Sequence, residues 1–194
     1  MLSPKPDWLK NHFPWEQKSL LVNGRTMAYI DEGDPDATPV LLLSGNPTWG
    51  FLYRFMIPVL VDGGYRAIAP DWIGAGYSDK PRNDAALTLP HHVADLVSLM
   101  DQLALRKFVI VGQDWGGPQG MGAALQRIER MAAGIFMNTW FFNDYLGQFH
   151  SSPFPWTSWL SPLVGQYFHK RIKTLSHGGP SVTTQRGMTD DEAR

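Results

Sequence analysis

The stretch KFVIVGQDWGGPQGMGAAL, residues 107–125, contains the change of pattern that decides the fold. It begins with an apolar run, Phe108 to Val111, which is typical of a strand buried on both faces. An acid, a tryptophan and two glycines follow Gly112, and the pattern becomes helical from Gly116. A buried strand that passes through a tight turn into a helix predicts one unit of a parallel α/β sheet.

The same alternation extends along the chain on both sides of this stretch. After an irregular arm at 1–17, strands at 18–22 and 25–31 are expected to form a hairpin through the turn Asn23-Gly24. Further elements are expected in the order strand 39–43, helix 50–61, strand 65–69, helix 91–105, strand 107–111, helix 116–131 and strand 133–137. Strands that alternate with helices predict a mostly parallel sheet with helices on both faces.

The composition changes after about Asn143. The segment SSPFPWTSWLSPLVG, residues 151–165, is rich in Ser, Pro and Trp and does not fit a strand. We therefore expect two parts, residues 1–143 as the N-terminal part of an α/β core and residues 144–194 as the start of a helical cap domain. The last residues, GMTDDEAR, have the pattern of a helix start, so the C-terminal part of the core is expected to be missing.

Composition also excludes several classes of protein. The formal net charge is -1 and Lys and Arg form no cluster, which argues against nucleic acid or an anionic membrane as a partner. Without cysteine, disulfides, thiolate metal sites and a cysteine nucleophile are excluded. No stretch resembles a signal peptide or a membrane span, so a cytoplasmic protein is expected. Because no nucleotide-binding motif or metal-ligand spacing occurs, neither a cofactor nor a metal is expected.

Asp114 fits the pattern of a nucleophile elbow, in which the nucleophile stands between small residues on a strand-to-helix turn. The alternative, that Asp114 only caps the next helix, is a common role for aspartate, but the flanking glycines and the preceding strand favour a nucleophile. A carboxylate is anionic at neutral pH and suits displacement of a good leaving group at a saturated carbon, or the opening of a strained ring. Water must later cleave the resulting ester with the help of a general base.

Two further residues are candidates for binding the leaving group. The loops 44–48, 71–81 and 112–117 follow strands, and open parallel sheets bind ligands beyond the carboxyl ends of their strands. A departing halide needs neutral N–H donors, and the indole of Trp115 and the side-chain amide of Asn46 supply them. Alone, Asn46 is better explained as a turn residue and Trp115 as a packing residue. Together with Asp114 at one edge of the sheet, they favour a halide site.

Four segments resemble haloalkane dehalogenases of the α/β-hydrolase superfamily: SGNPTWGFLYR (44–54), APDWIGAGYSDKP (69–81), VGQDWGGPQG (111–120) and MNTWFF (137–142). The resemblance covers residues 14–142. It implies Asp114 as the nucleophile, Asn46 and Trp115 as the halide-binding pair, and the backbone N–H groups of Asn46 and Trp115 as the oxyanion hole. It also implies a cap domain over an apolar pocket, with a small apolar halogenated substrate, water and halide as partners and no cofactor.

Two positions depart from the family pattern. Ser44 stands where many relatives carry histidine, and Asn138 occupies the position that one branch uses for the catalytic acid. In this superfamily the acid and the base follow the nucleophile along the chain, and their expected positions lie beyond Arg194. The six histidines do not obviously substitute: His12 lies in the arm, His91 and His92 begin a helix and are expected to be solvated, and the others lie in the cap-like segment, at positions 150, 169 and 177.

Three hypotheses therefore remain open. The first is hydrolysis of a carbon–halogen bond through an alkyl ester on Asp114. The second is epoxide hydrolysis, which uses the same nucleophile and needs acidic O–H donors in the cap, such as Tyr145 and Tyr167. The third is a truncated and catalytically incomplete chain, with at most one turnover and an exposed sheet edge that favours self-association. Substrate length, the halogen and the oligomeric state are left open.

Overall fold

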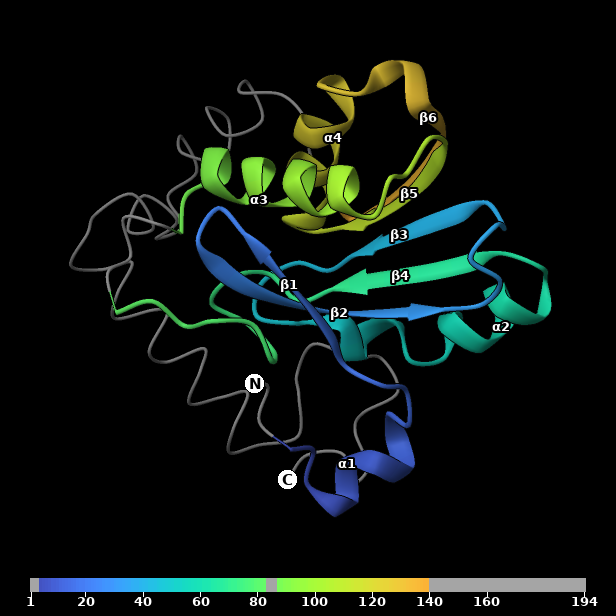
Figure 1. Cartoon of the computed structure of the whole chain (residues 1–194), viewed down its shortest axis with the longest axis vertical. Helices are drawn as coiled ribbons and strands as arrows, with labels where there is room; N and C mark the ends of the chain where they lie inside the picture. The colour runs from blue at the N-terminus through green and yellow to red at the C-terminus, as the bar shows by residue number, and fades with distance from the viewer. Residues whose placement is uncertain (1–3, 83–86, 140–194) are drawn as a thin grey trace, which may run out of the picture. The chain divides into compact units, whose positions relative to one another are not determined.

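The structure is a computed structural model of the chain and describes residues 4–82 and 87–139 (Figure 1). Two compact units are distinguished, Met1–Pro6 with Phe13–Phe141 and Asp7–His12 with Phe142–Arg194. Of the second unit only the short helix α1 (Asp7–His12) is described, and this helix corrects the expectation of an irregular arm throughout residues 1–17. The predicted cap, residues 144–194, lies outside the described residues.

In the described part of the first unit, strands form one sheet in the order β1-β2-β4-β3-β5-β6. The neighbours β4, β3, β5 and β6 pair in parallel, whereas β2 pairs antiparallel with both β1 and β4. The predicted mostly parallel sheet is therefore confirmed. The bounds of the strands are β1 (Lys18–Val22), β2 (Arg25–Glu32), β3 (Pro39–Leu43), β4 (Arg66–Pro70), β5 (Phe108–Gln113) and β6 (Met131–Met137).

The hairpin between β1 and β2 has the predicted turn. Asn23 and Gly24 have φ values of 47° and 80°, and a type I′ turn requires positive φ at both central residues. The turn sets the register, in which Val22 pairs with Arg25 and Lys18 with Tyr29.

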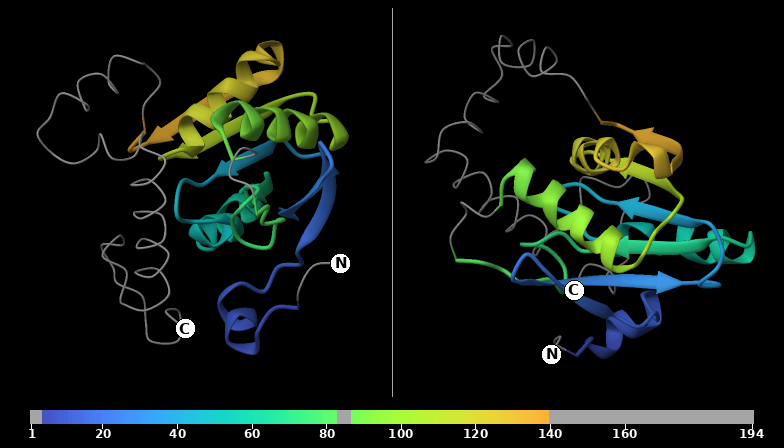
Figure 2. Two further views of the ribbon diagram at one scale, coloured as in Figure 1. Left: turned by 90° about the vertical axis from the view of Figure 1, so that its left-hand side faces the viewer. Right: turned by 45° about the horizontal axis from the view of Figure 1, so that its top comes forward.

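Helices cover both faces of the sheet, with α3 (Leu89–Gln102) and α4 (Gly116–Leu125) on one face and α2 (Met56–Asp62) on the other (Figure 2). The helix expected at 50–61 is divided into a 3₁₀ turn, η1 (Gly50–Tyr53), and α2. Pro58 explains the division, because it has no N–H to bond to the carbonyl of Arg54 and is tolerated only in the first turn of a helix. No helix within residues 4–82 and 87–139 has the length and apolar character to span a bilayer.

The helix expected at 116–131 is also shorter than predicted. α4 ends at Leu125, and a second 3₁₀ turn, η3 (Ile128–Arg130), precedes β6. Arg127 leaves the helical region with φ -142°, and its guanidinium pairs with the carboxylate of Asp101 at the end of α3. This ion pair ties the connection before β6 to the neighbouring helix.

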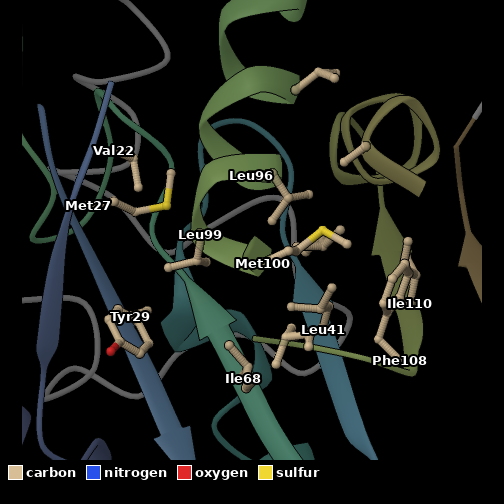
Figure 3. Close-up of a cluster of buried hydrophobic side chains, with 14 of the residues drawn as sticks. Val22, Met27, Tyr29, Leu41, Ile68, Leu96, Leu99, Met100, Phe108 and Ile110 are labelled. Carbon is tan, nitrogen blue, oxygen red and sulfur yellow. The ribbon is translucent and has the colours of Figure 1, made fainter. Parts of the chain in front are cut away.

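The main core lies between α3 and the sheet (Figure 3). Apolar side chains of α3 point toward side chains of the three central strands, and the hairpin closes one end of the cluster. All of the following have no exposed surface: Leu41, Ile68, Leu96, Leu99, Met100, Phe108 and Ile110. Burial of this apolar surface fixes β3, β4 and β5 relative to one another.

The order of the strands determines where a ligand site can form. From β3 the chain returns as β4 on one side of β3, and from β4 it crosses to β5 on the other side. The loops after β3 and β5 therefore depart in different directions from neighbouring strands. Such a topological switch point is where open α/β sheets bind their ligands.

Replacement of Leu41 by alanine is expected to lower the free energy of unfolding by about 3 kcal/mol, because truncation of a fully buried side chain leaves a cavity. Leu21→Ala removes the same atoms from a side chain that is 64% exposed and is expected to cost less than ~0.5 kcal/mol. Urea denaturation measures both. Equal losses would show that the space between β3 and α3 is not closely packed.

Candidate active site

Asp114 occupies the turn between β5 and α4, at the switch point. Its φ is 54°, in the left-handed region that non-glycine residues rarely adopt. Two backbone hydrogen bonds hold the turn: the N–H of Asp114 donates to the carbonyl of Met137 at 3.4 Å, and the carbonyl of Asp114 accepts from the N–H of Gly117 at 3.0 Å. The backbone geometry is that of a strained strand-to-helix elbow, as the sequence predicts.

Two glycines, which have no side chain, let the loop after β3 approach this elbow. A Cβ on Gly45 would overlap the side chain of Asp114, and a Cβ on Gly116 would overlap the carbonyl of Leu43. Both positions therefore require glycine for steric reasons. Their close approach brings the two loops of the switch point into direct contact.

This contact places N–H donors on the carboxylate of Asp114. The backbone N–H of Asn46 donates to Oδ1 at 3.1 Å, and the backbone N–H of Trp115 is a second donor. Partial burial raises the pKa of Asp114, whereas the bonds from Trp115 and Asn46 lower it, because they stabilise the charged form. Burial has the larger effect, so the pKa lies above the ordinary aspartate value.

The side chains of the predicted halide pair lie at the same edge of the sheet. Asn46 is exposed, and its peptide bond to Pro47 is cis. Trp115 is half-buried and directly precedes the first residue of α4. The structure thus brings Asp114, Asn46 and Trp115 together, while their chemical roles stay predictions.

Thr139 is a neighbour of the elbow that the sequence analysis did not single out. Its Oγ1 donates to the carbonyl of Asp114 at 2.7 Å, and its side chain fills the space beside Gly117. The available signal was its place two residues beyond β6, because β5 and β6 pair in parallel and end at the same edge. Asn138, at the preceding position, is exposed and has φ 44°.

Asp71 is a second acid that the sequence analysis did not single out. Its carboxylate is fully buried at the end of β4 and accepts the backbone N–H groups of Gly50 and Tyr77. Burial raises the pKa of Asp71 to about 6, and the two N–H bonds limit the increase. The signal for this residue was its place directly after a predicted strand, in the loop 71–81.

The histidines lie in different environments. The expectation that His92 is solvated is wrong, because its ring is buried edge-on against Trp72, with 5.7 Å between ring centroids, and burial lowers its pKa. His91 is exposed, and its Nδ1 lies 2.7 Å from Oγ1 of Thr88. His12 belongs to α1 in the second unit. The three histidines of the cap-like segment lie outside the described residues, so the general base is not assigned.

Among residues 4–82 and 87–139, no three His, Asp or Glu side chains are grouped as metal ligands require.

The fold and the elbow define an α/β hydrolase. The family model for the alpha/beta hydrolase fold matches residues 38–185, so the chain belongs to that family. Within it, the predicted resemblance to haloalkane dehalogenases is confirmed. A haloalkane dehalogenase of Psychrobacter cryohalolentis is 48% identical over 112 residues, which are 56% of this chain and 37% of that protein.

Other relatives carry different names. A cis-3-alkyl-4-alkyloxetan-2-one decarboxylase of Shewanella oneidensis is 36% identical over 180 residues, which are 89% of this chain and 54% of that protein. The chain therefore spans 37% and 54% of the length of these two curated relatives.

The similar solved structures also include both a haloalkane dehalogenase and a hydrolase of another kind. The tetrameric haloalkane dehalogenase DpaA from Paraglaciecola agarilytica NO2 has a TM-score of 0.65 at 38% identity, over 72% of this chain and 49% of that chain. Epoxide hydrolase A from Mycobacterium thermoresistibile has a TM-score of 0.59 at 33% identity, over 63% and 38%.

Replacement of Thr139 by valine is expected to lower the free energy of unfolding by about 1 kcal/mol, because valine keeps the shape but loses the hydrogen bond to the carbonyl of Asp114. Thr139→Ser keeps the hydroxyl and serves as the matched control. Chemical denaturation of the three proteins measures the difference. If the serine variant loses as much free energy of unfolding as the valine variant, the hydrogen bond is not the cause of the loss.

Proposed function

We propose that this chain carries the nucleophile and leaving-group side of a haloalkane dehalogenase-like active site, which cleaves carbon–halogen bonds. The observation that carries the proposal is the contact between the loops after β3 and β5, in which the N–H of Asn46 lies 3.1 Å from Oδ1 of Asp114. A carboxylate held at an elbow by backbone donors is arranged for attack on carbon. The similarity to haloalkane dehalogenases supports a halide as the leaving group.

In the first step an oxygen of Asp114 attacks the carbon that bears the halogen. A C–O bond forms, the carbon–halogen bond breaks, and the halide leaves with the bonding electron pair. The negative charge moves from the carboxylate to the halide, so donors at the halide strengthen their bonds most in the transition state. We assign this role to the side-chain N–H groups of Asn46 and Trp115.

In the second step water attacks the carbonyl carbon of the ester on Asp114, the bond between this carbon and the alkoxy oxygen breaks, and the alcohol leaves while the carboxylate is restored. The backbone N–H groups of Asn46 and Trp115 already donate to this carboxyl group, and they would stabilise the oxyanion that develops on it. This step also needs a general base to accept the proton of the water. Within residues 4–82 and 87–139, no histidine forms a hydrogen bond with Asp114.

The proposed partners are a small apolar halogenated substrate, water and the released halide. Self-association is proposed as well, because the similar DpaA structure is a tetramer. A cytoplasmic location stays a prediction.

Ring opening is the second candidate function. The likeness to epoxide hydrolase A favours it, and the oxetanone decarboxylase matches a larger share of this chain than the Psychrobacter dehalogenase does. An aspartate at an elbow suits both reactions, because a strained ring also carries its own leaving oxygen. Tyr145 and Tyr167, the candidate donors to an epoxide oxygen, lie outside the described residues.

Incubation with a short bromoalkane is expected to release bromide and add one alkyl group to Asp114, as intact and peptide mass spectrometry would show. Asp114→Asn keeps the size but removes the charge, and it is expected to abolish both signals. Trp115→Phe is expected to slow ester formation roughly a hundredfold, because it removes a leaving-group donor.

Parallel incubations with an epoxide and a cis-dialkyl oxetan-2-one distinguish the candidates. Ring opening with no bromide release would exclude the dehalogenase proposal. A Trp115→Phe variant that loses dehalogenation but keeps epoxide opening would assign the indole to the halide.

The rate of ester formation is expected to fall as the pH decreases through the pKa of Asp114, because the protonated carboxyl group cannot attack. Partial burial raises this pKa, so the midpoint of the decrease is expected above the usual aspartate range. Rapid-quench mass spectrometry at constant ionic strength measures it. The pKa of Asp71 is also raised, to about 6, so the decrease must persist in Asp71→Asn if Asp114 causes it. A rate that stays constant into acid would contradict the assignment.

A further inference from the structure

The segment 45–49, which carries Asn46, is anchored at both ends by two consecutive residues, Asp71 and Trp72. Before the segment, Nε1 of Trp72 donates to the carbonyl of Ser44 at 2.6 Å. After it, the N–H of Gly50 donates to Oδ1 of Asp71 at 3.0 Å. Asp71 is fully buried and Trp72 is 5% exposed, so water competes little for either bond.

These two anchors are themselves fixed to the sheet. The N–H of Asp71 donates to the carbonyl of Ala28 in β2 at 2.9 Å, and the carbonyl of Asp71 accepts from Oγ of Ser78. The same Oγ accepts the N–H of Ala28 at 2.8 Å. The second carboxylate oxygen of Asp71 accepts the N–H of Tyr77 at 2.8 Å. The segment is therefore connected to β2 by an unbroken series of hydrogen bonds.

The hydrogen bond from Trp72 goes to the carbonyl of Ser44, a residue beyond the paired part of β3. β3 ends at Leu43, and its register with β5 ends at the pair Leu43 and Gly112, so Ser44 lies one residue beyond the ladder. The next carbonyl, that of Gly45, accepts both the N–H and Oγ1 of Thr48. The carbonyls of Ser44 and Gly45, the two residues before Asn46, thus accept hydrogen bonds from the loop residues Trp72 and Thr48.

We propose that Asp71 and Trp72 are positioning residues that hold the backbone N–H of Asn46 on the carboxylate of Asp114. The effect on reaction rate rests on the proposed function, whereas the effect on the Asn46 hydrogen bond does not. A displacement of about 1 Å at a reacting group can slow a reaction by up to ~100-fold, and a loop anchored on one side only permits such a displacement.

The charge state of Asp114 reports on this hydrogen bond independently of activity. The N–H of Asn46 lowers the pKa of Asp114, so loss of the bond raises it further. Trp72→Phe removes the donor to Ser44 without changing any charge. Asp71→Asn replaces an acceptor oxygen by a donor, and removal of its negative charge alone would lower the pKa of Asp114. An increased pKa of Asp114 in the Asp71→Asn variant would therefore come from loss of the Asn46 hydrogen bond and not from the removed charge.

Tyr53→Phe is the matched control. The hydroxyl of Tyr53 donates to the carbonyl of Leu43 at 2.8 Å and is buried, so this substitution also removes one buried donor from a carbonyl at the end of β3. Leu43 is held by the strand ladder, and the loop beyond it keeps both anchors. The control is expected to lose stability but to leave the Asn46 hydrogen bond intact.

The experiment measures two properties in the full chain and the three variants. Carbon-13 NMR titration gives the pKa of the Asp114 carboxyl group, and single-turnover mass spectrometry gives the rate of ester formation from a bromoalkane. Trp72→Phe and Asp71→Asn are expected to raise the pKa and to slow ester formation roughly tenfold, with little change in the substrate concentration that gives half the maximal rate. Tyr53→Phe is expected to change neither.

An unchanged pKa of Asp114 in the folded Trp72→Phe and Asp71→Asn variants would overturn the proposal, as would an equal increase in Tyr53→Phe. If the unmodified chain forms no ester, the proposed function fails and the titration alone decides on the positioning. If Trp72→Phe does not fold, as circular dichroism would show, Asp71→Asn decides, because it preserves the size of the side chain.

Discussion

The carboxylate of Asp114 is partly removed from water, and the backbone N–H groups of Asn46 and Trp115 compensate for part of that loss. The rest of the site depends on this balance. The N–H of Trp115 comes from the next residue of the elbow, but the N–H of Asn46 must be delivered by a different strand connection. This position of the Asn46 N–H requires three features of the fold. β3 must lie beside β5, residues 45 and 116 must be glycine where the loops after these strands come into contact, and the loop after β3 must have a fixed position.

The elbow is held in a strained conformation by contacts from neighbouring elements. A left-handed φ at a non-glycine residue costs about 1 to 2 kcal/mol, and two hydrogen bonds to the carbonyl of Asp114 offset that cost. One comes from Gly117 in the next turn and the other from Thr139, beyond β6. Because the second donor directly follows β6, which pairs in parallel with β5, the elbow depends on the correct assembly of the sheet as well as on its own sequence.

Local signals predicted the fold well because they act over a few residues. Asn23-Gly24 specifies its turn through two positive φ angles, and the continuous apolar run 39–43 is typical of a strand buried on both faces. The division of the helix expected at 50–61 was missed, although Pro58 is a local signal for it, since proline cannot continue a helix that starts at Gly50. The anchors of the site were not readable, because Thr139 and Trp72 act on residues 25 and 28 positions away. Single-sequence patterns do not report contacts over such separations.

In the proposed function, Asn46 and Trp115 use their backbone N–H groups and their side chains for different tasks. Their backbone N–H groups bind the carboxyl group, which every reaction of an elbow aspartate shares, so the side-chain types at 46 and 115 are irrelevant to that function. In the proposed function, the side chains of Asn46 and Trp115 bind the leaving group. Gly45, Gly116 and the buried anchors set the backbone geometry around Asp114, and in the proposed function the amide of Asn46 and the indole of Trp115 select the leaving group.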